Sequence, residues 1–180
     1  MGLPMGFLMQ NAKIVPGLAP ATKAAQADAD WVCLKAYDKV GILIYIAQGN
    51  AATTTITVDA ATSVAGANLN AGITLNDWWE IEDTAIGTDA GTNSDTWVKG
   101  AAAASIVGSA TASGASMYYI EINADDLVTG QSAFTAITQY DCVQAKIGGS
   151  DVADIGCVIY ILFPPRYAQA VSPTPSAIID

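Results

Sequence analysis

The chain has 180 residues, which suits one domain with tails better than two complete cores. Its 52% apolar and 13% charged residues exclude the composition of an intrinsically disordered chain. The net charge is −10 and the seven Lys and Arg residues are scattered along the sequence, which excludes a nucleic-acid interface built on clustered cations.

Residues 1–30 are predicted to form an extended N-terminal arm, because Pro and Gly interrupt any regular pattern there. The apolar residues of this arm include Leu3, Phe7, Leu8, Ile14 and Val15. The charged start and the long apolar core of a signal peptide are both missing. No later segment has the roughly 18 to 20 consecutive apolar residues of a membrane span, so no membrane partner is expected.

The first predicted strands follow the arm, over residues 31–37 and 40–48. Residues 42–46 are consecutively apolar and rich in Ile, which is typical of a strand buried on both faces. Residues 53–60 are predicted to be a strand with Ile56 and Val58 on one face and Thr55 and Thr57 on the other.

The middle of the chain is less regular. Residues 61–71 are predicted to form a short helix or a loop, residues 73–83 a strand, and residues 83–93 a surface loop. Trp78 and Trp79 are adjacent, so in a strand they point to opposite faces. We therefore expect one Trp in the core and the other toward solvent or a partner.

Weaker strands are predicted over 95–99 and 105–112, and a strong alternating strand over 117–123. Asp125 and Asp126 then start a turn. Residues 140–147 and 155–163 are predicted to be the last two strands, joined as a hairpin by a turn over 148–151. The prolines at 164 and 165 end the predicted sheet, and residues 166–180 are predicted to be a C-terminal tail.

About eight to ten short strands without a long helical segment predict an all-β fold, an antiparallel β-sandwich or jelly roll. We place a single domain over residues 31–165. No internal repeat of roughly 20 to 50 residues is visible, which argues against a propeller or a solenoid.

The chain lacks the side chain that most often activates a catalytic Ser or Cys nucleophile, because it has no histidine. Glu80, Glu82 and Asp83 are close in sequence, as are Asp125 and Asp126, but neighbouring acids are common in turns and on surfaces. We therefore expect no enzymatic activity and no catalytic residues.

No cofactor is expected either. Oxygen ligands for a structural calcium ion could come from Asp151 with Asp154, Asp125 with Asp126, or Asp89 with Asp95, although none has EF-hand spacing.

The three cysteines, Cys33, Cys142 and Cys157, lack the spacing of a zinc or redox motif and are expected to be buried thiols. Whether Cys142 and Cys157 lie on neighbouring strands and pair stays open.

Several phrases of the sequence resemble a known class of protein. They are QNAKIVPGLAPAT at residues 10–22, the block that begins WVCLKAYDKVGILIYIAQGN at residue 31, YYIEINADDL at 118–127, and YDCVQAKIGGSDVADIGCVIYILFPPRYA at 140–168. Together they resemble small virion structural proteins that tailed bacteriophages encode beside the major capsid protein, of the capsid decoration or cement type.

The resemblance implies a function without catalysis: binding to the outside of a capsid and bridging capsomers. The implied partners are the major capsid protein and further copies of the chain, as a trimer or dimer, and the implied location is the capsid surface after assembly in the host cytoplasm. The residues expected at the partner interface are Leu3, Phe7, Leu8, Ile14, Val15, Trp78 and Trp79. Two alternatives stay open: another virion part, such as a head–tail joining or tail protein, and a carbohydrate-binding or adhesion module.

Overall fold

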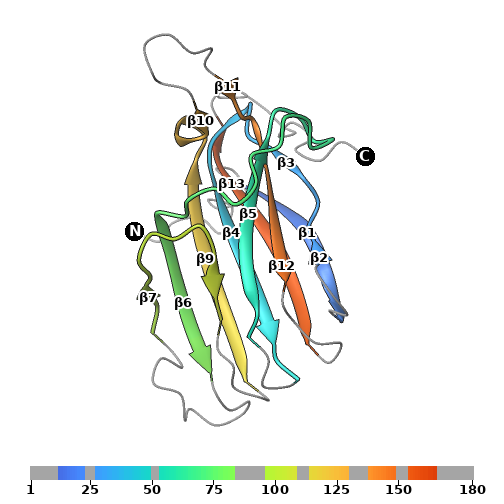
Figure 1. Ribbon diagram of the computed structural model, residues 1–180, viewed down its shortest axis with the longest axis vertical. Helices are drawn as coiled ribbons and strands as arrows, with labels where there is room; N and C mark the ends of the chain where they lie inside the picture. The colour runs from blue at the N-terminus through green and yellow to red at the C-terminus, as the bar shows by residue number, and fades with distance from the viewer. Residues whose placement is uncertain are drawn as a thin grey trace, which may run out of the picture.

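The computed structural model describes residues 12–22, 27–49, 53–83, 96–108, 114–129, 138–148 and 154–165. These residues form two antiparallel sheets packed face to face (Figure 1). In spatial order, the six-stranded sheet consists of β1 (Lys13–Thr22), β13 (Ile155–Pro165), β4 (Tyr37–Ala47), β9 (Ala115–Asn123), β6 (Asp77–Asp83) and β7 (Val98–Lys99).

The second sheet is shorter. It has the order β2 (Ala27–Asp28), β12 (Cys142–Gly148), β5 (Thr55–Ala61) and β8 (Ile106–Val107), and β3 (Val32–Cys33) also pairs with β12. A 3₁₀ turn, η1 (Ala124–Asp126), and the small pair β10 (Val128–Thr129) and β11 (Thr138–Gln139) lie at one end of the sandwich (Figure 1).

The chain alternates between the two sheets, which confirms the all-β sandwich prediction. With β2 and β3 counted as one interrupted strand, the orders β1-β13-β4-β9 and β2-β12-β5 are those of a jelly roll. In the smaller sheet β8 takes the place beyond β5, and β6 and β7 extend the six-stranded sheet beyond β9.

The core lies between the sheets and follows from residue alternation, because successive side chains of a strand point to opposite faces. In β4 the inward side chains are Val40, Ile42, Ile44 and Ile46, each at most 1% exposed. The facing side chains come from the smaller sheet: Ile56, Val58 and Ala60 of β5 and Val143, Ala145 and Ile147 of β12.

Tyr160 of β13 ties the two sheets together through its hydroxyl group. The ring is fully buried, the hydroxyl accepts a hydrogen bond from the backbone N–H of Ala145 at 3.0 Å, and it donates one to the carbonyl of Asp30 at 3.0 Å. Burial raises the pKa of Tyr160, so the hydroxyl keeps its proton and can donate. Gly17 makes room for the ring, since a Cβ there would lie 2.3 Å from it.

Three expectations from the sequence differ from the structure. The strands on either side of residues 148–151 do not form a hairpin: β12 pairs with β5, β2 and β3, and β13 pairs with β1 and β4 in the other sheet. Part of the predicted arm is a regular strand, because β1 pairs with β13. The predicted strand over 31–37 is shorter, with β3 limited to Val32–Cys33. Each difference depends on which strands pair with each other in the folded domain. The local sequence does not encode that pairing.

Other expectations are confirmed. The segment of residues 61–71 is a loop, Asp125 and Asp126 belong to the turn η1, and β13 ends at the predicted prolines. Among the described residues, no helix has the length and hydropathy that crossing a bilayer requires.

The Tyr160 link gives the first prediction. Tyr160→Phe should lower the free energy of unfolding by about 1 to 3 kcal/mol, because it leaves a buried N–H and a carbonyl without their partner. Tyr45→Phe, on an exposed side chain, is the control and should change stability by less than about 0.5 kcal/mol. Urea unfolding measures both, and equal stability of the two variants would contradict the assigned link.

Candidate interaction surface

The candidate functional site is the outward face of the six-stranded sheet. Strand alternation and register place one set of side chains there, away from the core. They are Ile14 and Pro16 of β1, Ile155, Cys157, Ile159, Ile161 and Phe163 of β13, Lys39, Leu43 and Tyr45 of β4, Met117, Tyr119 and Glu121 of β9, Asp77, Trp79 and Ile81 of β6, and Lys99 of β7. We call this set the outer apolar face.

Cross-strand neighbours make this face continuous from one edge of the sheet to the other. One row runs through Pro16, Ile159, Leu43, Tyr119, Trp79 and Lys99, each residue opposite the next in register. Neighbouring side chains cover one another, yet Ile14 and Ile155 remain 42% exposed and Tyr45 39% exposed. Extended exposed apolar patches are more common at interaction sites than elsewhere on protein surfaces, so this face is the candidate site.

The sequence predicted that residues 42–46 are buried on both faces, and the structure shows burial on one. Ile42, Ile44 and Ile46 lie in the core, whereas Leu43 is half-buried and Tyr45 is exposed on the outer apolar face. Continuous apolar strands are typical of sheets that are covered on both sides. The described residues of one chain cover one side.

Aromatic rings gather at the β6–β9 side of the face. The Trp79 and Tyr119 ring centroids are 5.8 Å apart, and Trp97, which is 41% exposed, meets Tyr119 edge-on at 6.5 Å. The Tyr119 ring lies over Gly41 of β4, where a Cβ would come within 2.6 Å of its hydroxyl oxygen. Aromatic residues are enriched at the energetic centres of protein interfaces.

The charges described on the outer apolar face form two ion pairs. Lys39 bonds Glu121 and its ammonium group lies 4.9 Å from the Phe163 ring centroid, while Lys99 contacts Asp77 at 2.6 Å. Burial and the Glu121 carboxylate raise the pKa of Tyr119 to about 12, so this side chain is uncharged at neutral pH. The outer apolar face is thus electrically balanced in a chain whose net charge is −10.

On the smaller sheet, Val107 of β8 is 63% exposed, but the outward positions of the two longer strands are mostly polar. On the smaller sheet the outward positions of β5 and β12 hold Thr55, Thr57, Asp59, Gln144 and Lys146. Asp59 accepts a hydrogen bond from the N–H of Gly72 at 2.8 Å and pairs with Lys146 at 2.7 Å, which raises the pKa of Lys146. The outward positions of β5 and β12 therefore differ in polarity from the outer apolar face.

The structure places some of the residues predicted for the interface on the outer apolar face and others in the core. Trp79 and Ile14 lie on the outer apolar face. Trp78 and Val15 point into the core at 9% and 5% exposure, and Trp78 donates a hydrogen bond from Nε1 to the carbonyl of Ala101 at 2.8 Å. The prediction of one core Trp and one outward Trp is confirmed. Leu3, Phe7 and Leu8 lie outside the described residues.

Sequence reasoning missed most of the face. Tyr45, Ile155 and Ile159 were not predicted as contacts, because an unbroken apolar run does not say which of its two faces the chain's own core will cover. Unbroken apolar runs in both β4 and β13 were the sequence signal that could have indicated an apolar outer face.

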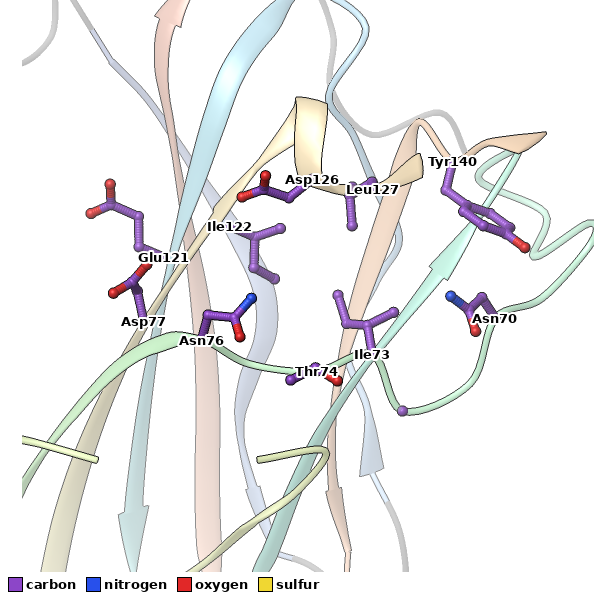
Figure 2. Close-up of a pocket in the computed structure, with 11 residues that line it drawn as sticks. Asn70, Ile73, Thr74, Asn76, Asp77, Glu121, Ile122, Asp126, Leu127 and Tyr140 are labelled. Atoms are coloured by element: carbon purple, nitrogen blue, oxygen red, sulfur yellow. The ribbon is translucent and has the colours of Figure 1, made fainter. Parts of the chain in front are cut away.

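A hollow of about 330 Å³ lies beside the face, between the loop at residues 70–76 and the turn η1 (Figure 2). Ile73, Ile122 and Leu127 form its apolar lining, with Tyr140 on one side and Asp77 and Glu121 on the other (Figure 2). These two carboxylates are the ones paired with Lys99 and Lys39 on the outer apolar face.

Of the proposed calcium ligands, Asp125, Asp126 and Asp154 are among the described residues. Asp126 of the hollow bonds the Asn123 side-chain amide at 2.8 Å. The described residues contain no group of three or more acidic, Cys or His side chains arranged to hold a metal ion. Asp89, Asp95 and Asp151 lie outside the described residues, so the calcium alternatives that involve them stay untested.

Comparisons with known proteins give weak likenesses. No family model and no curated protein sequence matches the chain. Among solved structures, the SPBc2 prophage-derived protein YomS is similar over 84% of this chain and 92% of its own, with 8% identity and a TM-score of 0.45. A structure from the infectious bursal disease virus Gx strain is similar over 86% of this chain and 40% of its own, with 10% identity and a TM-score of 0.24. Scores of this size carry no argument about function.

The assignment of the two faces of β4 gives the second prediction. Ile44→Glu should prevent folding, because it buries an unpaired carboxylate in the core. Tyr45→Glu, one residue along, should fold with a free energy of unfolding within about 1 kcal/mol of the parent. Circular dichroism and urea unfolding measure both, and loss of folding in Tyr45→Glu would refute the outward assignment.

Proposed function

We propose that this protein is a non-enzymatic virion structural protein that binds the outside of a bacteriophage capsid and stabilises the shell by bridging capsomers. In this proposal the outer apolar face is the surface that docks on the major capsid protein. The extent and charge balance of that face carry the proposal, and the sequence resemblance to capsid decoration proteins supports the choice of partner.

The size of the outer apolar face suits a stable interface. Strands lie about 4.8 Å apart and rise about 3.3 Å per residue, so the five longer strands, taken over about eight residues each, span roughly 600 Å². A standard interface buries about 800 Å² on each partner. The face is therefore close to the area that one specific contact needs.

Its charge distribution suits the same role. Burying an unpaired charge is costly, and the described charges of the outer apolar face are already matched as Lys39–Glu121 and Lys99–Asp77. In the proposal, the net negative charge of the chain lies mostly outside the docked face, where like charge keeps particles apart in solution.

Bridging converts a modest contact into a strong one. A protein that touches two capsomers at once, or that forms a dimer or trimer on the shell, must break several contacts together before the shell opens. The exposed edge strands β1 and β7 of the six-stranded sheet are the positions where copies could meet, since unpaired strand edges favour such contacts.

The third prediction concerns particle binding. The double variant Tyr45→Glu with Ile155→Glu should reduce binding to capsids that lack the protein by at least roughly tenfold, since it places two carboxylates in the proposed interface. Occupancy is measured by co-sedimentation with the particles and gel densitometry.

A matched control distinguishes an effect of the position of the new carboxylates from a general effect of added negative charge. Thr55→Glu with Thr57→Glu adds the same two carboxylates to the polar face of the smaller sheet and should leave occupancy unchanged. Equal loss in both double variants would indicate a general charge effect, and unchanged binding of Tyr45→Glu with Ile155→Glu would refute docking through the outer apolar face.

The N-terminal residues give the fourth prediction. Deleting residues 1–11 removes Leu3, Phe7 and Leu8 but keeps β1, and it should weaken particle binding because an apolar arm adds contacts on a neighbour. The same co-sedimentation assay measures this, with the unfolding midpoint as a check that the sandwich is intact. Unchanged occupancy would remove the arm from the proposed interface.

A further inference from the structure

Two of the three cysteines face each other across the ladder between β3 and β12. Cys33 and Cys142 are directly opposite in register, although they are far apart in the chain. Their neighbours Val32 and Val143 point into the core, so the two thiols point to the other side of the smaller sheet. The sequence had left open a pairing of Cys142 with Cys157, but Cys157 lies in the six-stranded sheet opposite Tyr45.

The backbone geometry at this pair suits a disulfide bond. The N–H of Leu34 bonds the carbonyl of Asp141 at 2.6 Å, which makes Leu34–Asp141 a hydrogen-bonded pair and Cys33–Cys142 the adjacent non-hydrogen-bonded pair. Cα atoms in such pairs are about 4.5 Å apart, within the roughly 4.4 to 6.8 Å that a disulfide spans. The bond can therefore form without moving the strands.

The two thiols are chemically different. Cys33 is half-buried on the short strand β3, whereas Cys142 is 1% exposed. A hydrogen bond from the Cys142 thiol, helped by the backbone N–H and charge of Lys35, lowers the pKa of Cys33 to about 6, against the opposing effects of burial and Asp141. The same hydrogen bond and burial raise the pKa of Cys142. Cys33 is therefore the thiol that a small oxidant can reach, and its lowered pKa favours the reactive thiolate, while Cys142 lies buried behind it.

We propose that Cys33 and Cys142 form a redox modification site that is converted to an intramolecular disulfide by a low-molecular-weight disulfide such as oxidised glutathione. The Cys33 thiolate attacks one sulfur of the oxidant, forms a mixed disulfide and releases one thiolate. The Cys142 sulfur then attacks the Cys33 sulfur, passes its proton to the departing thiolate, and closes the protein disulfide. One small disulfide is reduced to two thiols, and two protein thiols are oxidised.

The disulfide would stabilise the short pairing of β3 with β12. β3 has two residues, and its pairing with β12 holds the segment that leads from β2 into β4. The bond would close a loop of about 100 residues, and long loops gain the most from cross-linking. The dithiol form folds in a reducing cell, and the disulfide form is the more stable one in an oxidising medium.

The fifth prediction tests this site with the full chain and oxidised glutathione. Intact mass should fall by two hydrogens, peptide mapping should join Cys33 to Cys142, and the melting temperature should rise by roughly 10 °C over the reduced protein. Cys157→Ala is the control and should behave like the parent chain.

The variant Cys142→Ala separates the two steps. It keeps the buried position apolar and should retain one glutathione on Cys33, because the second sulfur is missing. Cys33→Ser should gain no adduct at Cys142. Disulfides that involve Cys157, joining of two chains, an adduct on Cys142 in Cys33→Ser, or unchanged thiols in the folded parent would each overturn the proposal.

Discussion

The structure depends on one constraint: its central strands are apolar on both faces, and a single sandwich core can cover one of them. β4 and β13 alternate between side chains such as Ile44 and Val158, which pack against the smaller sheet, and side chains such as Tyr45 and Ile159, which do not. Burial of the inner set drives folding. The outer set remains as an apolar surface that the described residues of one chain leave uncovered. In the proposed function, this surface docks on the capsid.

The rest of the molecule is arranged around this asymmetry. The outward positions of the smaller sheet hold polar groups that the chain itself satisfies: Asp59 and Gln144 are 3% and 9% exposed and bond to Gly72 and Ala29. Tyr160 links the two sheets through its hydrogen bonds with Ala145 and Asp30.

Much of the fold could be predicted from the sequence, because strand identity is a local property. Alternation located β5 and β9, the apolar runs located β4 and β13, and the adjacent tryptophans were correctly divided between core and surface. Sheet membership could not be predicted: the connection after β12 looked like a hairpin turn and crosses to the other sheet. The Cys33–Cys142 pair was hidden for the same reason, since register between distant strands is set by the whole sandwich.

The measurement that tests the central claim most directly is cryo-electron microscopy of the particle that carries this protein. The account predicts density on the outside of the shell at capsomer junctions, with Tyr45, Ile155 and Trp79 facing the major capsid protein and the Thr55–Thr57 side facing solvent. Density at the neck or tail, or a docked sandwich with its outer apolar face exposed to solvent, would contradict it.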